Sequence, residues 1–415
     1  MKTFNKNAIA RVLLLAGANL ALSPNSLAGS PAMSGIVAEA NDAESVFAAP
    51  AGMSRLEGTN MTVQGMVVRS LSSFDVDESK TAVEGGDPDN GEDPIIIPSL
   101  YYVRQLDDRW HAGISLTVPT GFGADYGSEW SGRYETVDFS LVYISLTPAV
   151  SYRWNDKLSF GAGTGITYTS NTSEVKFRQP IGGGGDGKIT SDLDGVGLSV
   201  TLSMLYEFTP RTRAGIAWTS DSDADLEGNV RLRNLNPLFD QVATELGIKN
   251  INTEFTNTLP QRVLAGMYHQ FESGNYFTLD GMWMKFSDFT VSDIELNGND
   301  VNVDLPDIYD DFWAITTGMG FPSGGRLTYK VGAMYVSQMV DDEDRTFAIR
   351  MDEMWGFGAG VSYKMSNDRV IDLNATLMNV GEAPVDTGNQ GATFGRVAGE
   401  SDDPWAVLME LTYHL

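Results

Sequence analysis

The chain has 415 residues, no cysteine, and 55 acidic against 28 basic side chains, for a formal net charge of −27. The absence of cysteine excludes a disulfide framework, a thiolate metal site and a cysteine nucleophile. A strongly negative chain would repel a phosphate backbone, so we expect no nucleic acid partner. No stretch approaches the roughly 18 to 20 apolar residues of a transmembrane helix. A membrane-spanning β-barrel is still allowed, because only its alternate residues meet lipid.

The first 28 residues are predicted to be a secretory signal peptide. Three basic residues precede a short apolar run over 12–18, and 26–28 form a small-x-small cleavage site. We expect cleavage after Ala28, with Ala21 as the alternative. A buried N-terminal helix is the competing interpretation. Export without cysteine indicates an envelope protein of a Gram-negative-type cell.

Most of the remaining sequence alternates between two faces with a period of two residues, as half-buried strands do. Over 354–365, large apolar residues alternate with glycine and polar residues, and the same pattern recurs over 110–119 and 158–170. Many of these stretches exceed nine residues and carry aromatic residues near their ends. Strands of about 9 to 11 residues with aromatic girdles are typical of transmembrane barrels.

Short polar turns alternate with long acidic or glycine-rich connections along the chain. The short turns are predicted at 105–108, 155–157, 209–212, 272–275, 323–325 and 366–368. The long connections are predicted at 75–93, 120–135, 179–191, 234–258, 297–309, 340–349 and 381–402. Six short turns and seven long loops make 13 connections, and therefore 14 strands. We predict an all-β fold: a 14-stranded antiparallel transmembrane β-barrel with both ends in the periplasm.

The last strand supports this prediction. One of its faces is apolar, with an aromatic residue third from the end: Val407, Met409, Leu411, Tyr413 and Leu415. This ladder resembles the signal that the barrel assembly machinery of outer membranes reads, although the usual last residue is phenylalanine. An ordinary final strand is the alternative interpretation.

Several segments together resemble the FadL/TodX family of outer-membrane transporters for hydrophobic compounds. A small-residue stretch over 35–45 is followed by 48–53, which is similar to the family's Asn-Pro-Ala-Gly motif with Ala49 in place of the asparagine. Further similarities lie, in order along nearly all of the mature chain, at 118–123, 130–134, 147–152, 158–163, 258–260 and 351–355. Each motif alone is weak, and their order makes the resemblance specific.

The resemblance implies a signal peptide at 1–28, an N-terminal hatch (plug) at 29–58 and a transmembrane barrel at 59–415. Family members carry long-chain fatty acids or aromatic hydrocarbons inward by passive diffusion. Extracellular loops capture the ligand, a site beside the hatch holds it, and a lateral gap near a kinked third strand releases it. We therefore expect a hydrophobic small-molecule ligand, contact with outer-membrane lipid and lipopolysaccharide, a monomer, and no cofactor.

The candidate hatch and gate residues are Asn41, Asp42, Pro50 and Ala51. Residues 29–58 are rich in alanine, glycine, serine and proline, and are too few for a core of their own. A plug inside a barrel lumen suits them, and a disordered leader is the alternative.

Strand three is predicted to be kinked, because Pro119 removes a donor from its hydrogen-bond ladder. With Gly121, Phe122 and Gly123, this proline forms the candidate lateral opening. The alternative is that Pro119 merely ends the strand.

The loop 234–258 is predicted to carry a short helix with Pro237 in its first turn. Its apolar stripe is the candidate capture surface: Leu235, Leu238, Phe239, Val242 and Leu246. An apolar stripe on an extracellular loop needs either a ligand or the barrel rim. The neighbouring loop at 181–187 is glycine-rich, where fatty-acid members of the family usually have a helical insertion.

Recognition of a carboxylate would need an arginine or lysine in the lumen. The candidates are Arg133, Arg178, Arg231 and Arg262. Fatty-acid members often carry a basic residue where this chain has Ser170, which favours an uncharged hydrocarbon.

Other functions remain open at this point. A general diffusion porin predicts charged walls without a plug, and a structural barrel has no distinguishing sequence feature. A lipase-like enzyme needs a serine beside a histidine, whereas His111, His269 and His414 have no serine motif. The acidic loops are interpreted as solvated surface, with divalent-cation bridging to lipopolysaccharide as the alternative; their spacing is not that of an EF-hand, so we expect no metal site.

Overall fold

A computed structural model describes residue 32 and residues 34–89, 94–289, 291–301, 308–347, 352–388 and 395–415. The predicted signal peptide at 1–28 lies outside these residues, as does the start of the predicted hatch. Among the described residues, no helix is both long and apolar enough to cross a membrane.

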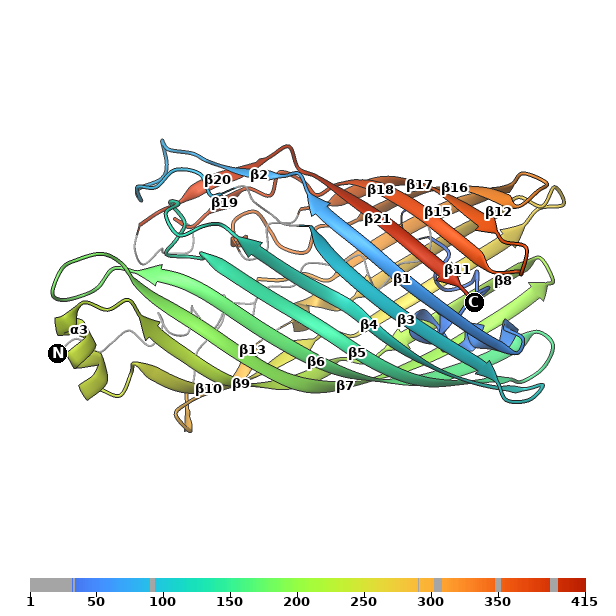
Figure 1. Ribbon diagram of the computed structural model, residues 1–415, viewed down its shortest axis with the longest axis horizontal. Helices are drawn as coiled ribbons and strands as arrows, with labels where there is room; N and C mark the ends of the chain where they lie inside the picture. The colour runs from blue at the N-terminus through green and yellow to red at the C-terminus, as the bar shows by residue number, and fades with distance from the viewer. Residues whose placement is uncertain are drawn as a thin grey trace.

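The described chain forms a closed antiparallel barrel of 14 strands, as predicted (Figure 1). Three of these strands are each interrupted once, so that two elements make one strand: β8 with β9, β10 with β11, and β12 with β13. The barrel elements are β1 (Thr59–Ser70), β3 (Ile95–Gln105), β4 (Trp110–Asp125), β5 (Asp138–Arg153), β6 (Leu158–Phe177), β7 (Gly187–Thr209), β8 (Thr212–Thr219), β9 (Ser222–Arg233), β10 (Asn250–Leu259), β11 (Arg262–Gln270), β12 (Tyr276–Met284), β13 (Val291–Leu296), β15 (Phe312–Pro322), β16 (Leu327–Val336), β17 (Met354–Lys364), β18 (Val370–Asn379) and β21 (Trp405–His414). The first and last strands close the barrel, in a register from Thr62 opposite His414 to Ser70 opposite Ala406.

The two-residue period places large apolar side chains outside and small ones inside. On β17, Trp355 and Phe357 are exposed on the outer face, and on β6 Phe160 and Ile166 are exposed in the same way. Tryptophans gather near both ends of the outer face, at Trp110 and Trp154 beside short turns and at Trp218, Trp283, Trp313 and Trp355 toward the other end. An apolar band between two aromatic girdles is the surface that a bilayer requires.

The six predicted short turns are confirmed within a few residues, but three predicted long loops are partly wrong. β4 continues to Asp125, β7 begins at Gly187 and β10 begins at Asn250, so a part of each of 120–135, 179–191 and 234–258 is strand. These strand ends rise above the apolar band, where the outward residues are polar. In these strand ends both faces consist mainly of polar residues and glycine, so the sequence does not distinguish them from loops.

The long connections carry several small elements. They are β2 (Ser73–Val76), α3 (Pro237–Glu245), η4 (Phe286–Asp288), β14 (Asn299–Asp300), β19 (Val385–Asp386) and β20 (Ala398–Asp402). β19, β20 and β2 form a separate three-stranded sheet that joins two loops. Beneath it, the rings of Phe74, Trp130 and Phe347 pack edge to face. This apolar cluster fixes the loops over one side of the barrel mouth.

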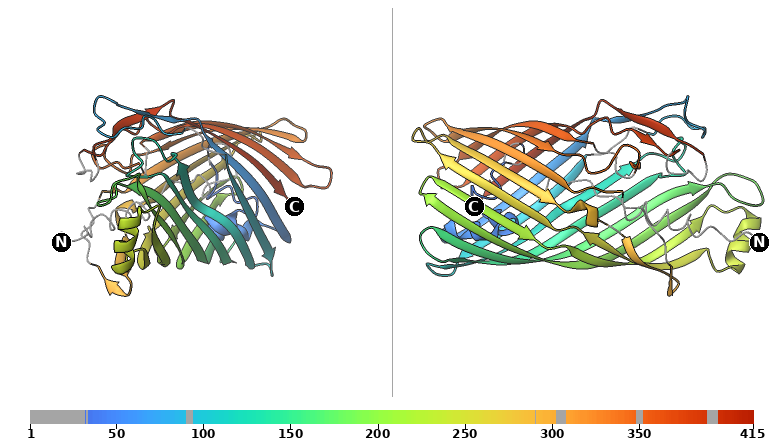
Figure 2. Two further views of the ribbon diagram at one scale, coloured as in Figure 1. Left: turned by 60° about the vertical axis from the view of Figure 1, so that its left-hand side comes forward. Right: turned by 180° about the vertical axis from the view of Figure 1, so that it is seen from behind.

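Residues 34–57, here called the inner segment, lie inside the barrel near the end with the short turns (Figure 2). The segment contains α2 (Ser45–Ala48) and η3 (Pro50–Arg55). Small residues on the wall make room for it: a Cβ atom added at Gly113 would come within 2.8 Å of both Val46 and Met53. Gly161, Gly215, Gly266 and Gly318 make room for the segment in the same way.

Candidate functional site

A wall carboxylate holds the start of the inner segment. Asp280 on β12 accepts hydrogen bonds from the backbone amides of Gly35 and Val37, and its side chain is 4% exposed. Gly35 has a φ of +88°, a conformation that residues with a Cβ rarely adopt. Two amide donors on one buried carboxylate fix both the position and the direction of the chain at this point.

An arginine two strands away, on β8 beyond β11, holds the next residues. Arg213 on β8 donates hydrogen bonds to the carbonyl oxygens of Ala38 and Glu39, and its guanidinium lies 3.8 Å from the ring centre of Tyr268. Glu39 is buried in the lumen. This burial raises the pKa of the Glu39 carboxyl to about 7, against the opposing effect of Lys330.

The end of the inner segment is attached to β4, β5 and β7, on the side of β8 away from β12. The amide of Ala51 donates to Ser203 Oγ on β7 (2.8 Å), and His111 on β4 bonds the carbonyl oxygen of Leu56 (2.9 Å). Arg153 donates to the carbonyl oxygen of Ser54, and Arg55 pairs with Glu207. Segment and wall therefore form one bonded unit at both ends of the segment.

The candidate hatch residues occupy different parts of this segment. Pro50 and Ala51 are buried against β6 and β7, where a Cβ at Gly161 would overlap their backbone. Asn41 is exposed and donates to Glu39 Oε1 (2.9 Å), and Asp42 accepts from the amide of Glu44 (2.9 Å). The first two thus pack on the wall, while the other two shape the segment itself.

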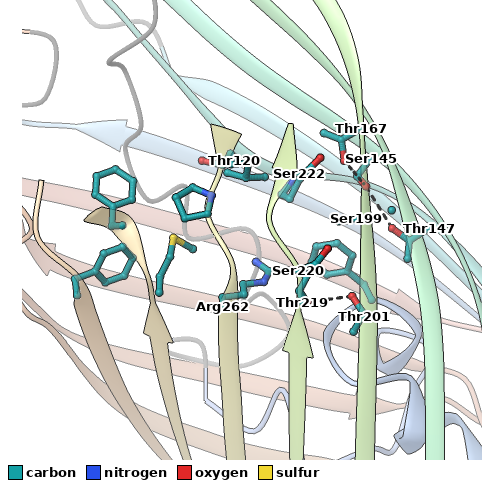
Figure 3. Close-up of a pocket in the computed structure, with 18 of the residues that line it drawn as sticks. Thr120, Ser145, Thr147, Thr167, Ser199, Thr201, Thr219, Ser220, Ser222 and Arg262 are labelled. Carbon is teal, nitrogen blue, oxygen red and sulfur yellow. Dashed lines mark hydrogen bonds between the residues drawn. The ribbon is translucent and has the colours of Figure 1, made fainter. Parts of the chain in front are cut away.

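A cavity lies between the inner segment and the wall (Figure 3). One side of it is lined by hydroxyl groups: Thr120, Ser145, Thr147, Thr167, Ser199, Thr201, Thr219, Ser220 and Ser222. Most of the other lining residues are apolar: Phe47, Pro119, Leu259, Pro260, Met284, Phe286, Phe312 and Met339. Several hydroxyls bond one another, as Thr167 does Ser145 (3.1 Å). The cavity is therefore amphipathic, and suits a ligand with a polar end and an apolar body.

Arg262 provides the charged group of this cavity. It begins β11, directly after the strand break at Pro260, and its guanidinium lies 5.4 Å from the ring centre of Phe47. Among the described residues, Arg262 has no ion-pair partner, and its buried Nε has no hydrogen-bond acceptor. A buried donor without an acceptor is costly, and a guanidinium can donate to an anion or to a neutral oxygen.

The wall ladder is incomplete beside the cavity. β3 and β4 pair from Gln105–His111 only as far as Leu100–Leu116, and residues 95–99 of β3 pair with β1 alone. The register of β4 against β5 shifts between Thr117 and Thr120. Pro119 lies at this shift and faces the cavity, whereas β4 continues to Asp125, so the alternative that the proline ends the strand is wrong.

The residues after the proline remain in the wall. Gly121, Phe122 and Gly123 continue β4 as the direct partners of Val142, Leu141 and Ser140 on β5. The unpaired edge of β4 therefore faces β3. A stretch of β3 and a stretch of β4 thus run without mutual hydrogen bonds at the level of the cavity.

The predicted apolar stripe on α3 is partly buried against the barrel rim and partly exposed. Phe239 is 1% exposed and packs against Phe177 of β6, with ring centres 6.0 Å apart. Leu238 and Leu246 are exposed, and Leu235 and Val242 are half-buried. Asn236 caps the helix by accepting from the amide of Phe239 (2.9 Å). One edge of the helix is therefore anchored on the rim, and another faces outward.

Of the four candidate arginines, Arg262 alone lines the cavity. Arg133 pairs with Asp186 (3.1 Å) in the extracellular connections, and Arg178 donates to the Tyr134 hydroxyl (3.3 Å). Arg231 lies near the extracellular end of β9.

The residues that hold the inner segment, Asp280 and Arg213, were not among the predicted site residues. Each is a charged residue among the inward-facing residues of a strand that is otherwise apolar or made of small residues. A charge at such a position is the sequence signal that could have identified them. Among the described residues, no group of three or more His, Cys, Asp or Glu side chains could hold a metal ion.

The chain is similar to known outer membrane proteins over nearly its whole length. The family model described as outer membrane protein transport protein (OMPP1/FadL/TodX) matches residues 10–414. Outer membrane protein P1 of Haemophilus influenzae is 23% identical over 90% of this chain and 89% of its own length. The long-chain fatty acid transport protein of Escherichia coli K12 is 21% identical, covering 88% and 89% of the two chains.

Solved structures show the same fold. A FadL homologue of Pseudomonas aeruginosa superimposes with a TM-score of 0.80 at 20% identity, over 95% of this chain and 99% of that chain. The toluene transporter TodX of Pseudomonas putida gives a TM-score of 0.67 at 19% identity, over 94% and 96%. With a family match over nearly its full length and a closed 14-stranded barrel, this chain belongs to the OMPP1/FadL/TodX family of outer membrane transport proteins.

Proposed function

We propose that the protein is a passive channel for hydrophobic compounds, with capture outside the barrel, a binding site beside the inner segment, and lateral exit through the wall. The observation that carries this proposal is the position of the cavity. Phe47 of the inner segment lines one part of it, and Pro119 at the register shift of β4 lines another. A ligand in this cavity would touch both the hatch and the incomplete ladder between β3 and β4.

The proposed ligand is an amphipathic carboxylate, such as a long-chain fatty acid. Arg262 would receive the carboxylate, and the phenylalanines and methionines of the cavity would receive the chain. Ser170, which favoured a hydrocarbon at the sequence level, does not bear on the lumen. Its neighbours Thr169 and Asn171 are buried on the inward phase of β6, so Ser170 faces outward.

A general porin fits the same barrel less well. Its lumen would be open to water, whereas here the inner segment is bonded to the wall at both ends. An apolar lining also offers apolar molecules a path that water-filled pores lack. A serine hydrolase would need a histidine beside a serine, and His111 is instead bonded to the carbonyl oxygen of Leu56.

Capture is proposed to occur on the outward edge of α3. Replacing Leu238 and Leu246 with aspartate should lower uptake of a labelled long-chain carboxylate several-fold, because the two exposed apolar contacts become charged. The control replaces Gln241 and Thr244, exposed polar positions of the same helix, with aspartate. Unchanged uptake by the leucine variant, at equal surface expression, would remove α3 from the capture step.

Lateral exit predicts that a covalent bridge across the incomplete ladder stops transport. Because the chain has no cysteine, Ile97→Cys with Thr120→Cys can be joined selectively by a short bismaleimide. Uptake should fall to background in the bridged protein, whereas the same double-cysteine variant without the bismaleimide should keep its uptake. The control bridge is Ser173→Cys with Ser191→Cys, direct partners on β6 and β7. Full uptake by the bridged Ile97–Thr120 variant would show that ligand leaves by another route.

A further inference from the structure

Part of the barrel wall stands well above the membrane. β6, β7, β9 and β10 extend past the other strands at the end that carries α3 (Figure 1). On β7 the last large exposed apolar residue in this direction is Val196, and the next outward residues are Asp194 and Asp192. The outer face above Val196 is therefore polar, and it lies where the outer leaflet presents its sugars.

The top of this face is basic. Lys188 on β7 is the direct partner of Arg233 on β9, and Thr190 is the direct partner of Arg231. The two arginines point outward, because Val230 and Leu232, which alternate with them, are buried. Lys176 on β6 is in turn the direct partner of Lys188, but Lys176 is buried.

Like charges placed directly opposite one another destabilise a sheet. Among the described residues, neither Arg231 nor Arg233 forms an ion pair, although the chain carries 55 acidic residues. Lys188 is paired with Glu174 (2.6 Å) and Lys176 with Glu129 (2.7 Å). Among the described residues the two arginines thus have no ion-pair partner, and an external anion would lower the repulsion between Arg233 and the directly opposite Lys188.

The spacing of these cations suits a single phosphate group. Directly opposite residues have Cβ atoms about 5 Å apart, and residues two apart on one strand are separated by roughly 7 Å. Arg231, Arg233 and Lys188 therefore form a triangle that one phosphate can bridge. Guanidinium groups bind phosphate through two parallel hydrogen bonds, and the Thr190 hydroxyl lies opposite Arg231 as a further donor.

The height of the triangle selects which phosphate it meets. Six residues separate Asp194 from Lys188, about 20 Å along the strand and roughly 15 Å above the apolar band at ordinary strand tilt. Below it, Asp194 is the direct partner of Glu227, and both carboxylates would repel phosphates at the lipid head. A phosphate on a sugar above the lipid head would instead meet the arginines.

We propose that Arg231, Arg233 and Lys188 form a binding site for a sugar phosphate of lipopolysaccharide in the outer leaflet. The site lies on the outer face of the wall, away from the cavity that contains Arg262. By binding this phosphate, the site would attach the extended ends of β6, β7, β9 and β10 to the polysaccharide layer. This role does not depend on which compound the channel carries.

The test is binding of fluorescent lipopolysaccharide with a short, phosphorylated core to the purified protein. Arg231→Gln with Arg233→Gln should weaken binding at least about tenfold. Enzymatic removal of the core phosphates should weaken binding to the wild type by a similar factor and leave the variant unaffected. The control is Arg326→Gln with Arg369→Gln, which makes the same charge change at the opposite end of the barrel, where these arginines contact Tyr363 and Tyr413.

Two further arms decide the source and chemistry of the ligand. Inorganic phosphate, at the concentration of the glycolipid phosphate, should not displace it; full displacement would make this a free-anion site and overturn the proposal. Arg231→Lys with Arg233→Lys should bind with intermediate affinity, since charge is kept and paired hydrogen bonds are lost. Wild-type affinity in the glutamine variant would also overturn the proposal.

Discussion

Deletion of residues 34–57 should convert the barrel into a conducting pore. The inner segment is bonded to Asp280 and Arg213 at one end and to Ser203 and His111 at the other, and it fills the glycine-lined part of the lumen. Without it, the small inward side chains cannot close a lumen of this width, since barrels with more than about eight strands are too wide to be filled by wall side chains alone. Planar-bilayer recording of the purified variant measures the change.

A second variant tests the attachment of the inner segment while the segment itself is kept. Asp280→Asn keeps the shape of the side chain but weakens its bonds to the two amides, so it should give brief openings of the full-length protein rather than a permanently open pore. The wild-type protein should conduct little under the same voltage. A deletion variant that folds, yet conducts no more than the wild type, would contradict the role of residues 34–57 as a hatch.

Replacement of Arg262 by glutamine should weaken the binding of carboxylates but not that of neutral ligands. Binding of a long-chain carboxylate should weaken by roughly 10- to 100-fold, the value of a hydrogen bond to a charged group. Binding of the methyl ester of the same chain should be unchanged, because the ester makes no ion pair with the guanidinium. Tryptophan fluorescence or calorimetry on the purified protein gives both affinities.

Two controls accompany this comparison. Arg178→Gln makes the same change on an exposed arginine outside the cavity and should alter neither affinity. Arg262→Lys keeps the charge and should restore part of the carboxylate affinity. An equal loss for carboxylate and ester would show that Arg262 only shapes the cavity, and wild-type carboxylate affinity in the glutamine variant would show that the head group binds elsewhere.

The barrel could be predicted from the sequence because its signals are local. Outward Trp355 and Phe357 alternate with glycine along β17, and tight polar turns join neighbouring strands. Strand count and antiparallel pairing follow from such turns without any long-range information. The prediction failed at the strand ends above the membrane, where both faces lose their apolar contrast and 120–125 of β4 reads as loop.

The site could be predicted only in part, since its contacts are distant in the sequence. Pro119 could be predicted to disturb the strand because a proline cannot donate a backbone hydrogen bond. Arg262 could be noticed because it follows Pro260, which interrupts a strand. By contrast, the bond from Gly35 to Asp280 joins residues 245 positions apart, and no periodicity links them. The apolar stripe of α3 predicted the helix, but the division into a buried Phe239 and an exposed Leu238 depends on the rim of β6.

As proposed, a hydrophobic carboxylate moves passively through a barrel that excludes hydrophilic solutes. The most direct measurement uses vesicles with lipopolysaccharide in their outer leaflet, the purified protein, and two labelled solutes: a long-chain carboxylate and a sugar of similar mass. The carboxylate should equilibrate much faster than in protein-free vesicles without any energy source, and the sugar should not. Sugar flux as fast as carboxylate flux would identify a general porin and contradict the proposed function.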